Sequence, residues 1–369
     1  MITKYILDNG LSIILEPINS VVSISAGLWV KTGSRHENIN QYGYAHCLEH
    51  MLFKGTKNYS ARELARRIDR VGGQHNAATN REYTCYYINV VYDHLELAIE
   101  ALADMYYNST FDSNELEKEK NVIIEEIRMY EDTPDELIHD LFIENMFYGS
   151  SLSHSILGTI DSISNINRNG IVEFYDQHYS NDNTIFVIAG NFNEDKTKLL
   201  IEKYFSEKRI SHNKKEIISE DPKRNDFLHI ERDLEQVHFC LGLDGLQKDD
   251  ENRWALYLYS TILGGSMSSR LFQNIRENEG ISYSIYSFHS SYSDYGIFGI
   301  YCATSPETYE RAIELTMREC RTLATNGVTK EELEDAKNFI IGNLALSLES
   351  IEVRMGQLAK NEISYNRHY

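Results

Sequence analysis

The sequence predicts an α+β protein of two homologous domains, each an antiparallel sheet with helices packed on one side. The chain has 369 residues, which is more than one ordinary hydrophobic core accommodates. Runs of β-branched residues alternate with helical patterns in its first half. Part of the chain also recurs: "ELEKEKNVII" at 115–124 resembles "ELEDAKNFII" at 332–341, and "AIE" precedes each, at 98–100 and 312–314. Two matches in the same order indicate a duplicated unit.

The first half supplies the elements of one such unit. Ser60 begins a helix, because Glu63 three residues later completes a capping-box pattern, and this helix ends at Gly72 and Gly73. Pro134 begins a later helix. The other expected elements follow from hydrophobic patterning: strands at 11–17, 20–30, 83–91 and 183–191, and helices at about 45–55, 93–108 and 112–131.

A polar, charge-dense stretch at 206–226 separates the two halves: "SEKRISHNKKEIISEDPKRND". It has few side chains to bury, which is typical of a linker. We therefore expect a first domain over 1–210, a linker over 211–226 and a second domain over 227–369.

The composition limits the partners and the compartment of the protein. The chain is 42% hydrophobic and 25% charged, as a folded globular protein is, and its formal net charge is -20. Nucleic acids and anionic membranes require a surplus of Lys and Arg, so neither is an expected partner. No apolar run reaches membrane-spanning length, and the N-terminus lacks the pattern of a secretory signal. The five scattered cysteines, without a CxxC, predict reduced thiols, and we expect a cytoplasmic protein.

The stretch "GYAHCLEHMLFKGT" at 43–56 carries the strongest chemical signal. On a helix, His46, Glu49 and His50 share one face. Two imidazoles on one face offer ligands for Zn²⁺, and Glu49 could act as general base at the remaining coordination position. The order is the inverse of the commoner His-Glu-x-x-His motif. A solvated helix face with two incidental histidines is the alternative, and the apolar residues at 51–53 argue against it.

A catalytic zinc site requires a third protein ligand. The stretch 116–136 offers many carboxylates, among them Glu119 and Glu126, which stand two helical turns apart on one face. The second copy lacks the proposed groups, because Glu49, His50, Glu119 and Glu126 align with Ser268, Ser269, Ala336 and Asn343. This is the pattern expected of one active copy and one scaffold copy.

The chain resembles the M16 peptidases, the group of pitrilysin, insulin-degrading enzyme and mitochondrial processing peptidase, and specifically the bacterial members with one two-domain half per chain. Three motifs carry the resemblance, in order and over nearly the whole chain: "HCLEHMLFKGT", "GGQHNAATNREYT" and "EKEKNVIIEEI". The resemblance implies a half-clamshell fold.

The resemblance also implies roles for individual residues. His46, His50 and Glu126 match the ligands of one Zn²⁺ per chain, and Glu49 matches the catalytic base. Glu119 matches a second carboxylate that supports the site by hydrogen bonding.

Substrate-binding residues are implied in both halves. In "SSRLFQNIRENEGISYSIYS" at 268–287, Arg276 and Tyr283 fall at the family's substrate-binding positions. Arg276 can donate hydrogen bonds to a peptide carbonyl, and Tyr283 can stabilise a developing oxyanion. Asn76 and Ala77 lie in the strand that pairs with extended substrate in the family. Pairing through the main chain tolerates many sequences, so specificity should be loose.

The sequence departs from the family pattern in two places. Cys47 replaces the usual aromatic residue after the first His and should face away from the metal. The chain ends at "NEISYNRHY", earlier than family members do, so we expect the second domain to lack a closing helix and strand. Three further histidines, His75, His139 and His154, have no assigned role and are expected to be structural.

These observations predict a zinc-dependent endopeptidase that hydrolyses short or unfolded peptides. Because the chain carries both the zinc motif and the substrate-binding pair, we expect a homodimer. Two alternatives remain: a processing peptidase with one dedicated substrate, and a catalytically silent scaffold subunit. The intact set of His46, Glu49, His50 and Glu126 argues against a silent subunit.

Overall fold

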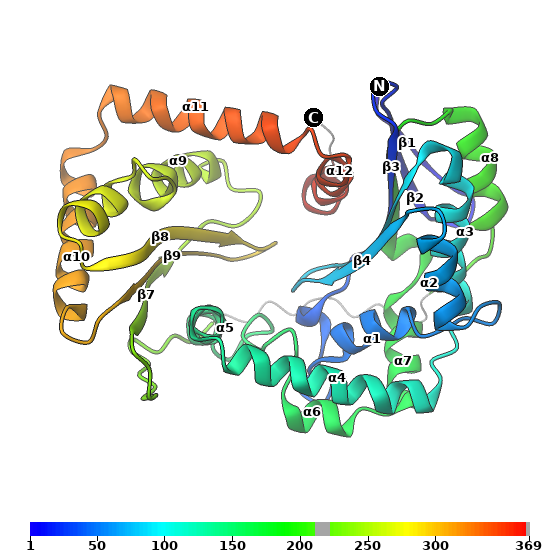
Figure 1. The fold of residues 1–369 in the computed structure, drawn as a ribbon, viewed down its shortest axis with the longest axis horizontal. Coiled ribbons are helices and arrows are strands. Elements are labelled where there is room, and N and C mark those ends of the chain that lie inside the picture. The colour runs from blue at the N-terminus through cyan, green and yellow to red at the C-terminus, as the bar shows by residue number, and fades with distance from the viewer. Residues whose placement is uncertain (211–221, 367–369) are drawn as a thin grey trace. The chain divides into compact units, whose positions relative to one another are not determined.

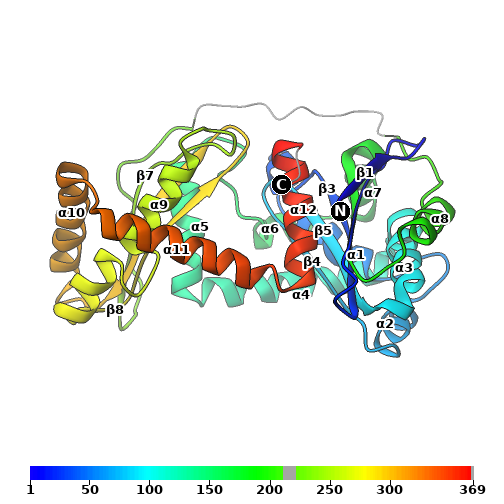
Figure 2. The same cartoon turned by 90° about the horizontal axis from the view of Figure 1, so that it is seen from above.

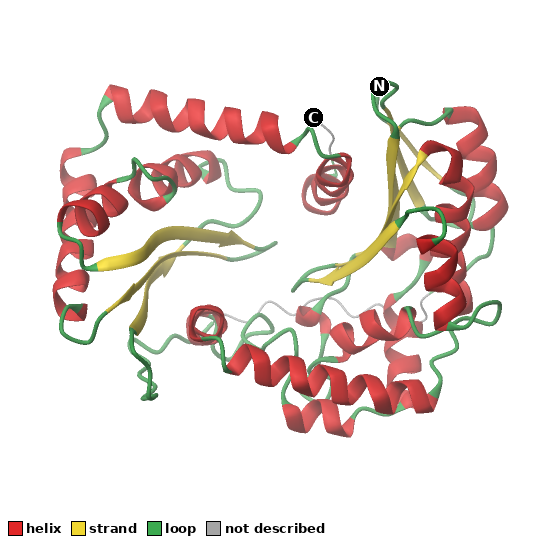
Figure 3. Ribbon diagram, viewed as in Figure 1, coloured by secondary structure: helices red, strands yellow, loops and turns green. Residues whose placement is uncertain are grey.

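The computed structural model describes residues 1–210 and 222–366, and its contacts divide the chain into two compact units, each with its own sheet (Figure 1 and Figure 3). The first unit comprises Met1–Met129, His154–Ile218 and Leu348–Tyr369. The second unit comprises Tyr130–Ser153 and Ser219–Ser347.

These units differ from the contiguous domains that the sequence predicts. Residues 130–153 belong with the second unit rather than the first. The reason is that α5 (Pro134–Met146) packs against β7 (Val237–Asp244), and Phe142 and Met146 join an apolar cluster there.

The C-terminal residues also lie in a different unit from the one that the sequence predicts. Residues 348–369 belong with the first unit, because α12 (Ile351–Tyr365) contacts the first sheet. The linker expected at 211–226 falls mostly on 211–221, which lie outside the described residues.

The sheet of the first unit has six strands in the order β1-β2-β6-β3-β5-β4. Only β2 and β6 pair in parallel; all other neighbours are antiparallel, which confirms an antiparallel-rich α+β fold. The strands are β1 (Thr3–Ile6), β2 (Ser12–Pro17), β3 (Ser23–Val30), β4 (Gln74–Thr79), β5 (Thr84–Val91) and β6 (Thr184–Gly190). Strand β4 ends the order, so one of its edges has no neighbouring strand within the described part of the chain.

Helices cover both faces of this sheet, not one. Alternate residues of a strand point to opposite faces. On one face, Trp29 and Val187 pack against Met355 of α12, and a side chain on Gly27 would lie 2.6 Å from the Met355 sulfur. Helix α3 (Leu95–Asn108) lies on the other face, as the two views agree (Figure 1 and Figure 2). Strand β6 is therefore buried along its whole length.

Helices α1, α2 and α4 of the first unit lie close to the ranges that the sequence predicts, whereas α6, α7 and α8 are additional. Ser60 and Glu63 form the expected capping box of α2. The helices are α1 (Tyr44–Leu52), α2 (Ala61–Asp69), α4 (Ser113–Glu131), α6 (Ile160–Asn165), α7 (Arg168–His178) and α8 (Glu194–Tyr204), with short 3₁₀ turns η1 (Ser34–His36), η2 (Tyr92–His94) and η3 (Asn181–Asn183).

The second unit has an antiparallel sheet in the order β7-β9-β8, with β8 at Ser282–Ser291 and β9 at Gly296–Thr304. Its other helical segments are α9 (Arg253–Gly264), the π-helical η4 (Phe272–Asn278), α10 (Tyr309–Asn326) and α11 (Lys330–Ser347). Leu263, Ile300 and Leu315 are part of one buried cluster that joins α9, β9 and α10.

The order of elements repeats between the units. If the short 3₁₀ turns η1 and η2 are set aside, a strand, two helical segments, a hairpin and two helices run from β3 to α4 and again from β7 to α11. The similar segments at 115–124 and 332–341 fall in the corresponding helices α4 and α11. Within the described residues, no helix is long and apolar enough to cross a membrane.

Candidate metal centre

Helix α1 holds the two histidines of the motif side by side. It begins after Gly43, whose φ of 86° is left-handed and whose missing side chain avoids Ile163 Cδ1. Cys47 and Leu48 are fully buried against the first unit, as expected for the side away from the motif. The rings of His46 and His50 lie edge to face, 4.7 Å between centroids.

Helix α4 brings Glu126 to these histidines. Glu126 Oε2 lies 3.7 Å from His46 Nε2 and 3.7 Å from His50 Nε2. Ligand atoms that surround one tetrahedral zinc ion at about 2.0–2.2 Å are about 3.4 Å apart. All three donor atoms lie within 4.8 Å of one another, close enough to hold one metal ion, and they form the one group of this kind found among the described residues.

Glu119 contacts the ring nitrogen of His50 that faces away from Glu126. Its Oε2 accepts a hydrogen bond from His50 Nδ1 at 3.1 Å, and its Oε1 forms an ion pair with Lys54 Nζ at 2.7 Å. Because Nδ1 donates, the Nε2 of His50 carries the lone pair and faces Glu126. This orientation is the one that a metal-binding imidazole requires.

His46 is the most buried member of the group. Burial, with a smaller effect of the neighbouring His50, lowers the pKa of His46 to about 3. The imidazole is therefore neutral at neutral pH, as a metal ligand must be. Its buried Nδ1 has no hydrogen-bond partner within the described part of the chain.

Glu49 is held by a residue that the sequence analysis missed. The Thr79 hydroxyl donates a hydrogen bond of 2.5 Å to Glu49 Oε2, and the Thr79 backbone N–H also bonds the carboxylate. Burial raises the pKa of Glu49, and the Thr79 hydrogen bonds oppose that shift. The sequence pattern could have singled out Thr79, because it stands two residues after Ala77 and therefore lies on the same face of the strand.

The residues expected to bind substrate in the first unit lie on its edge strand. Asn76 is exposed and Ala77 is half-buried on β4, opposite Tyr87 and Tyr86 of β5. The Asn76 side chain accepts a hydrogen bond of 2.9 Å from the backbone N–H of Ala77. The open edge of β4 offers main-chain groups to an extended chain.

Arg276 and Tyr283 belong to the second unit, where they contact each other. The Arg276 guanidinium lies over two rings, 4.5 Å from the centroid of Tyr283 and 4.6 Å from that of Phe272. Tyr283 is 77% exposed. Its hydroxyl is therefore accessible to a ligand.

Two models of known protein families match the sequence of this chain. Residues 13–160 match the family described as "Insulinase (Peptidase family M16)", and residues 165–340 match "Peptidase M16 inactive domain".

This chain belongs to the M16 peptidase family.

The M16 chain is similar over its whole length to proteins named zinc proteases. One from Bacillus subtilis, named "Uncharacterized zinc protease YmxG", is 42% identical and covers 100% of this chain and 90% of its own. One from Streptomyces coelicolor, named "Uncharacterized zinc protease SCO5738", is 35% identical over 97% of this chain and 80% of its own. The expected resemblance to M16 peptidases is confirmed.

Two solved structures share the fold of this M16 chain. A protease from Helicobacter pylori superposes with a TM-score of 0.92 at 23% identity, over 98% of this chain and 89% of that one. A peptidase M16 inactive domain from Pseudomonas fluorescens gives 0.90 at 21% identity, over 99% and 88%. At these identities the similarity establishes the fold alone.

Proposed function

We propose that this chain is a zinc-dependent endopeptidase that hydrolyses short or unfolded peptides in the cytoplasm. The observation that carries the proposal is the convergence of three donors: the Nε2 atoms of His46 and His50 each lie 3.7 Å from Glu126 Oε2. Three protein ligands that leave one position open are typical of catalytic zinc sites. Zinc, when bound, supplies a Lewis acid that lowers the pKa of a water molecule and polarises a carbonyl.

The chain's own residues supply the remaining chemistry. Glu49 stands one residue before His50 and accepts the proton of the attacking water, while Thr79 fixes its carboxylate. Glu119 keeps His50 in the tautomer that binds metal. The open edge of β4 binds the backbone of an extended peptide, which favours unfolded substrates of varied sequence.

Arg276 and Tyr283 complete the proposed machinery. Arg276 donates to a substrate carbonyl, and the exposed Tyr283 hydroxyl donates to the developing oxyanion. We expect a homodimer in which this pair serves the partner's substrate. A silent scaffold would not require the metal ligands, Glu49 and Thr79 to converge as they do.

Metal analysis combined with a cleavage assay tests the proposal. Purified protein should contain one zinc per chain by mass spectrometry and should cleave internally quenched peptides. A chelator should abolish cleavage, and added zinc should restore it. Cleavage that survives complete metal removal, or metal-loaded protein that cleaves none of a broad peptide set, would contradict the proposal.

A further inference from the structure

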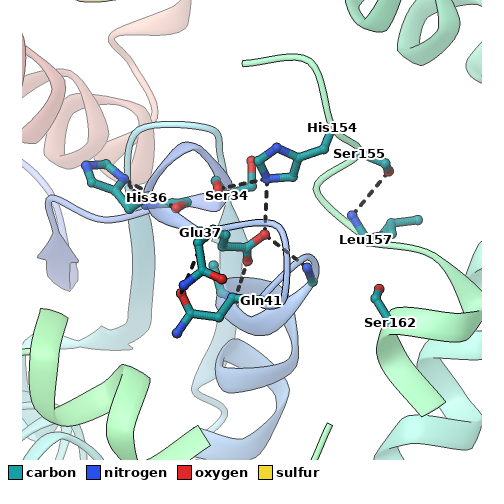
Figure 4. A network of polar contacts seen from close by, with 12 residues as sticks. Ser34, His36, Glu37, Gln41, His154, Ser155, Leu157 and Ser162 are labelled. Atoms are coloured by element: carbon teal, nitrogen blue, oxygen red, sulfur yellow. Dashed lines mark hydrogen bonds and ion pairs between the residues drawn. The ribbon is translucent and has the colours of Figure 1, made fainter. Parts of the chain in front are cut away.

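Glu37 is a fully buried carboxylate at the start of the helix that carries the histidines (Figure 4). Its Oε2 accepts a hydrogen bond from the backbone N–H of Gly43 at 3.0 Å, and its Oε1 accepts one from that of Ala45 at 2.7 Å. N–H groups in the first turn of a helix have no acceptor within the helix. Glu37 therefore caps α1 from outside, with a negative charge at the end of the helix that favours one.

His154 holds Glu37 from the opposite side, out of a distant segment of the chain (Figure 4). Its Nε2 lies 2.9 Å from the Ser34 carbonyl oxygen and 3.1 Å from Glu37 Oε2. A carbonyl oxygen only accepts, so Nε2 carries the proton and donates to both groups. The ring also stacks on Tyr42 at 4.1 Å between centroids. His154 is thus fixed in one orientation.

The segment 33–37 is bound to the turn after β4 as well. The backbone N–H of Ser34 donates to Asn80 O, and that of Arg35 donates to Arg81 O. A side chain on Gly33 would lie 1.9 Å from Asn80 O, so only glycine allows this approach. Asn80 directly follows Thr79, which holds Glu49. One short segment thereby joins the start of α1 to the strand that holds the general base.

The way in which α1 is capped differs from that of the neighbouring helices. The residue before α1 is a glycine with no capping side chain. Burial raises the pKa of Glu37, and the hydrogen bonds from His154, Ala45 and Gly43 oppose that shift, so the cap requires a costly buried carboxylate. Five other helices of the same unit use an ordinary local cap, from Ser60, Thr159, Asn167, Asn193 or Ser350, while α3 has no capping side chain.

We propose that Glu37, held by His154, is a positioning residue that fixes the first turn of α1 and thereby the orientation of His46 toward Glu126. Ala45, which Glu37 binds, directly precedes His46, so a displaced first turn moves this ligand first. The effect on catalysis rests on the proposed function. The effect on the helix and on metal affinity does not depend on peptide cleavage.

Glu37→Gln is the first test, made on the full chain. The amide group would place N–H donors against the N–H of Gly43 or of His154 in a buried site, which breaks the cap while keeping the shape. We expect the zinc dissociation constant, measured by competition with a chromogenic chelator, to rise by about 10–100-fold, the usual effect of losing a group that orients a ligand. Hydrogen exchange of the amides in α1 should accelerate at the same time.

Ser60→Ala is the matched control, since it removes the local cap of α2 in the same unit. It should lower the thermal midpoint, yet leave the zinc dissociation constant and exchange in α1 unchanged. If Glu37→Gln and Ser60→Ala had the same effect on both readouts, Glu37 would be an ordinary stabilising cap and the proposal would be wrong.

A pair of His154 variants keeps the test decisive if Glu37→Gln does not fold. His154→Phe retains a ring to stack on Tyr42 but donates no hydrogen bond, whereas His154→Gln retains an N–H donor. Zinc affinity should fall in the first variant and recover in part in the second. Unchanged zinc affinity and α1 exchange in His154→Phe would overturn the inference, whether or not the wild-type protein cleaves peptides.

Discussion

The Thr79 hydroxyl donates a hydrogen bond of 2.5 Å to Glu49 Oε2. This contact joins the end of the edge strand β4 to the carboxylate proposed as general base. The strand proposed to hold the substrate thus also orients the group that activates water, and a shift of one would disturb the other.

Thr79→Val should lower kcat without removing metal. Valine keeps the volume but loses the hydroxyl donor, so Glu49 can rotate away from its working position. We expect a loss of about 10–100-fold in kcat, as for other groups that orient a catalytic residue, with a smaller change in KM. Thr79→Ser should recover most of the activity. Equal activity of the Val and Ser variants would show that the hydrogen bond has no role.

Glu49→Gln should keep the metal and lose cleavage. The amide preserves the shape of the side chain but cannot accept the proton of water, and the loss of a general base typically lowers the rate by about 10²–10⁴-fold. Zinc content by mass spectrometry is measured beside kcat. Near-wild-type turnover in this variant would refute the assignment of Glu49.

Glu126→Gln and His50→Ala should lose both metal and activity. Each removes one of three donors, so the remaining two hold zinc weakly. Dialysis against a mild chelator, followed by metal analysis, separates these variants from Glu49→Gln. Stoichiometric zinc in either variant after such dialysis would mean that the ligand set is wrong.

An ion pair in the second unit predicts how the stability of the protein depends on pH. Arg270 forms two hydrogen bonds with Glu332, at 2.7 and 2.9 Å, and they lower the pKa of Glu332 from 4.5 to about 2. Because the folded pKa is the lower one, the stabilisation is complete above 4.5 and is lost as the pH falls toward 2.

Glu332→Gln should therefore destabilise the protein at pH 7 by about 1 kcal/mol, and the difference from wild type should shrink below pH 4.5. Urea unfolding of both proteins at pH 7, 4 and 3 measures this difference in the free energy of unfolding. Glu331→Gln, at an exposed position beside it, is the control and should change little at any pH. A difference between wild type and Glu332→Gln that is independent of pH would exclude the ion pair as its cause.

Mixing two inactive variants tests the expected homodimer. Glu49→Gln lacks the base and Tyr283→Phe lacks the oxyanion donor. If Arg276 and Tyr283 act on the substrate of the partner subunit, a mixed dimer contains one intact site and one doubly defective site. Activity should reappear, at most at about half the wild-type level per mixed dimer. The absence of recovery despite demonstrated subunit exchange would mean that the pair does not act on the partner's substrate.

Local rules predict four strands and four helices of the first unit, and the shared face of the candidate site's three central residues. The i, i+3, i+4 spacing alone places His46, Glu49 and His50 on one face, and the capping box at Ser60 follows from the sequence of one turn. The proposed third ligand, Glu126, follows only from the family resemblance, because helix α4 offers many carboxylates of equal local merit and the duplication leaves both Glu119 and Glu126 open.

Contacts between distant parts of the chain were not predictable in this way. His154 was expected to be structural, and its partner Glu37 stands 117 positions earlier with no periodic pattern that joins them. The sequence predicts that residues 227–369 form the second domain, whereas Met355 of α12 packs on Trp29, 326 positions away. Such pairings depend on how whole elements assemble, and a single sequence does not encode them in any local pattern.

A crystal of the full chain grown with zinc, measured on both sides of the zinc absorption edge, tests the central claim most directly. We predict one anomalous peak per chain, bonded by the Nε2 atoms of His46 and His50 and by a Glu126 carboxylate oxygen at about 2.0–2.2 Å. No other protein atom should bond the ion, and Glu49 should face the remaining position. The absence of a peak between these residues, or a peak held by other side chains, would contradict the account.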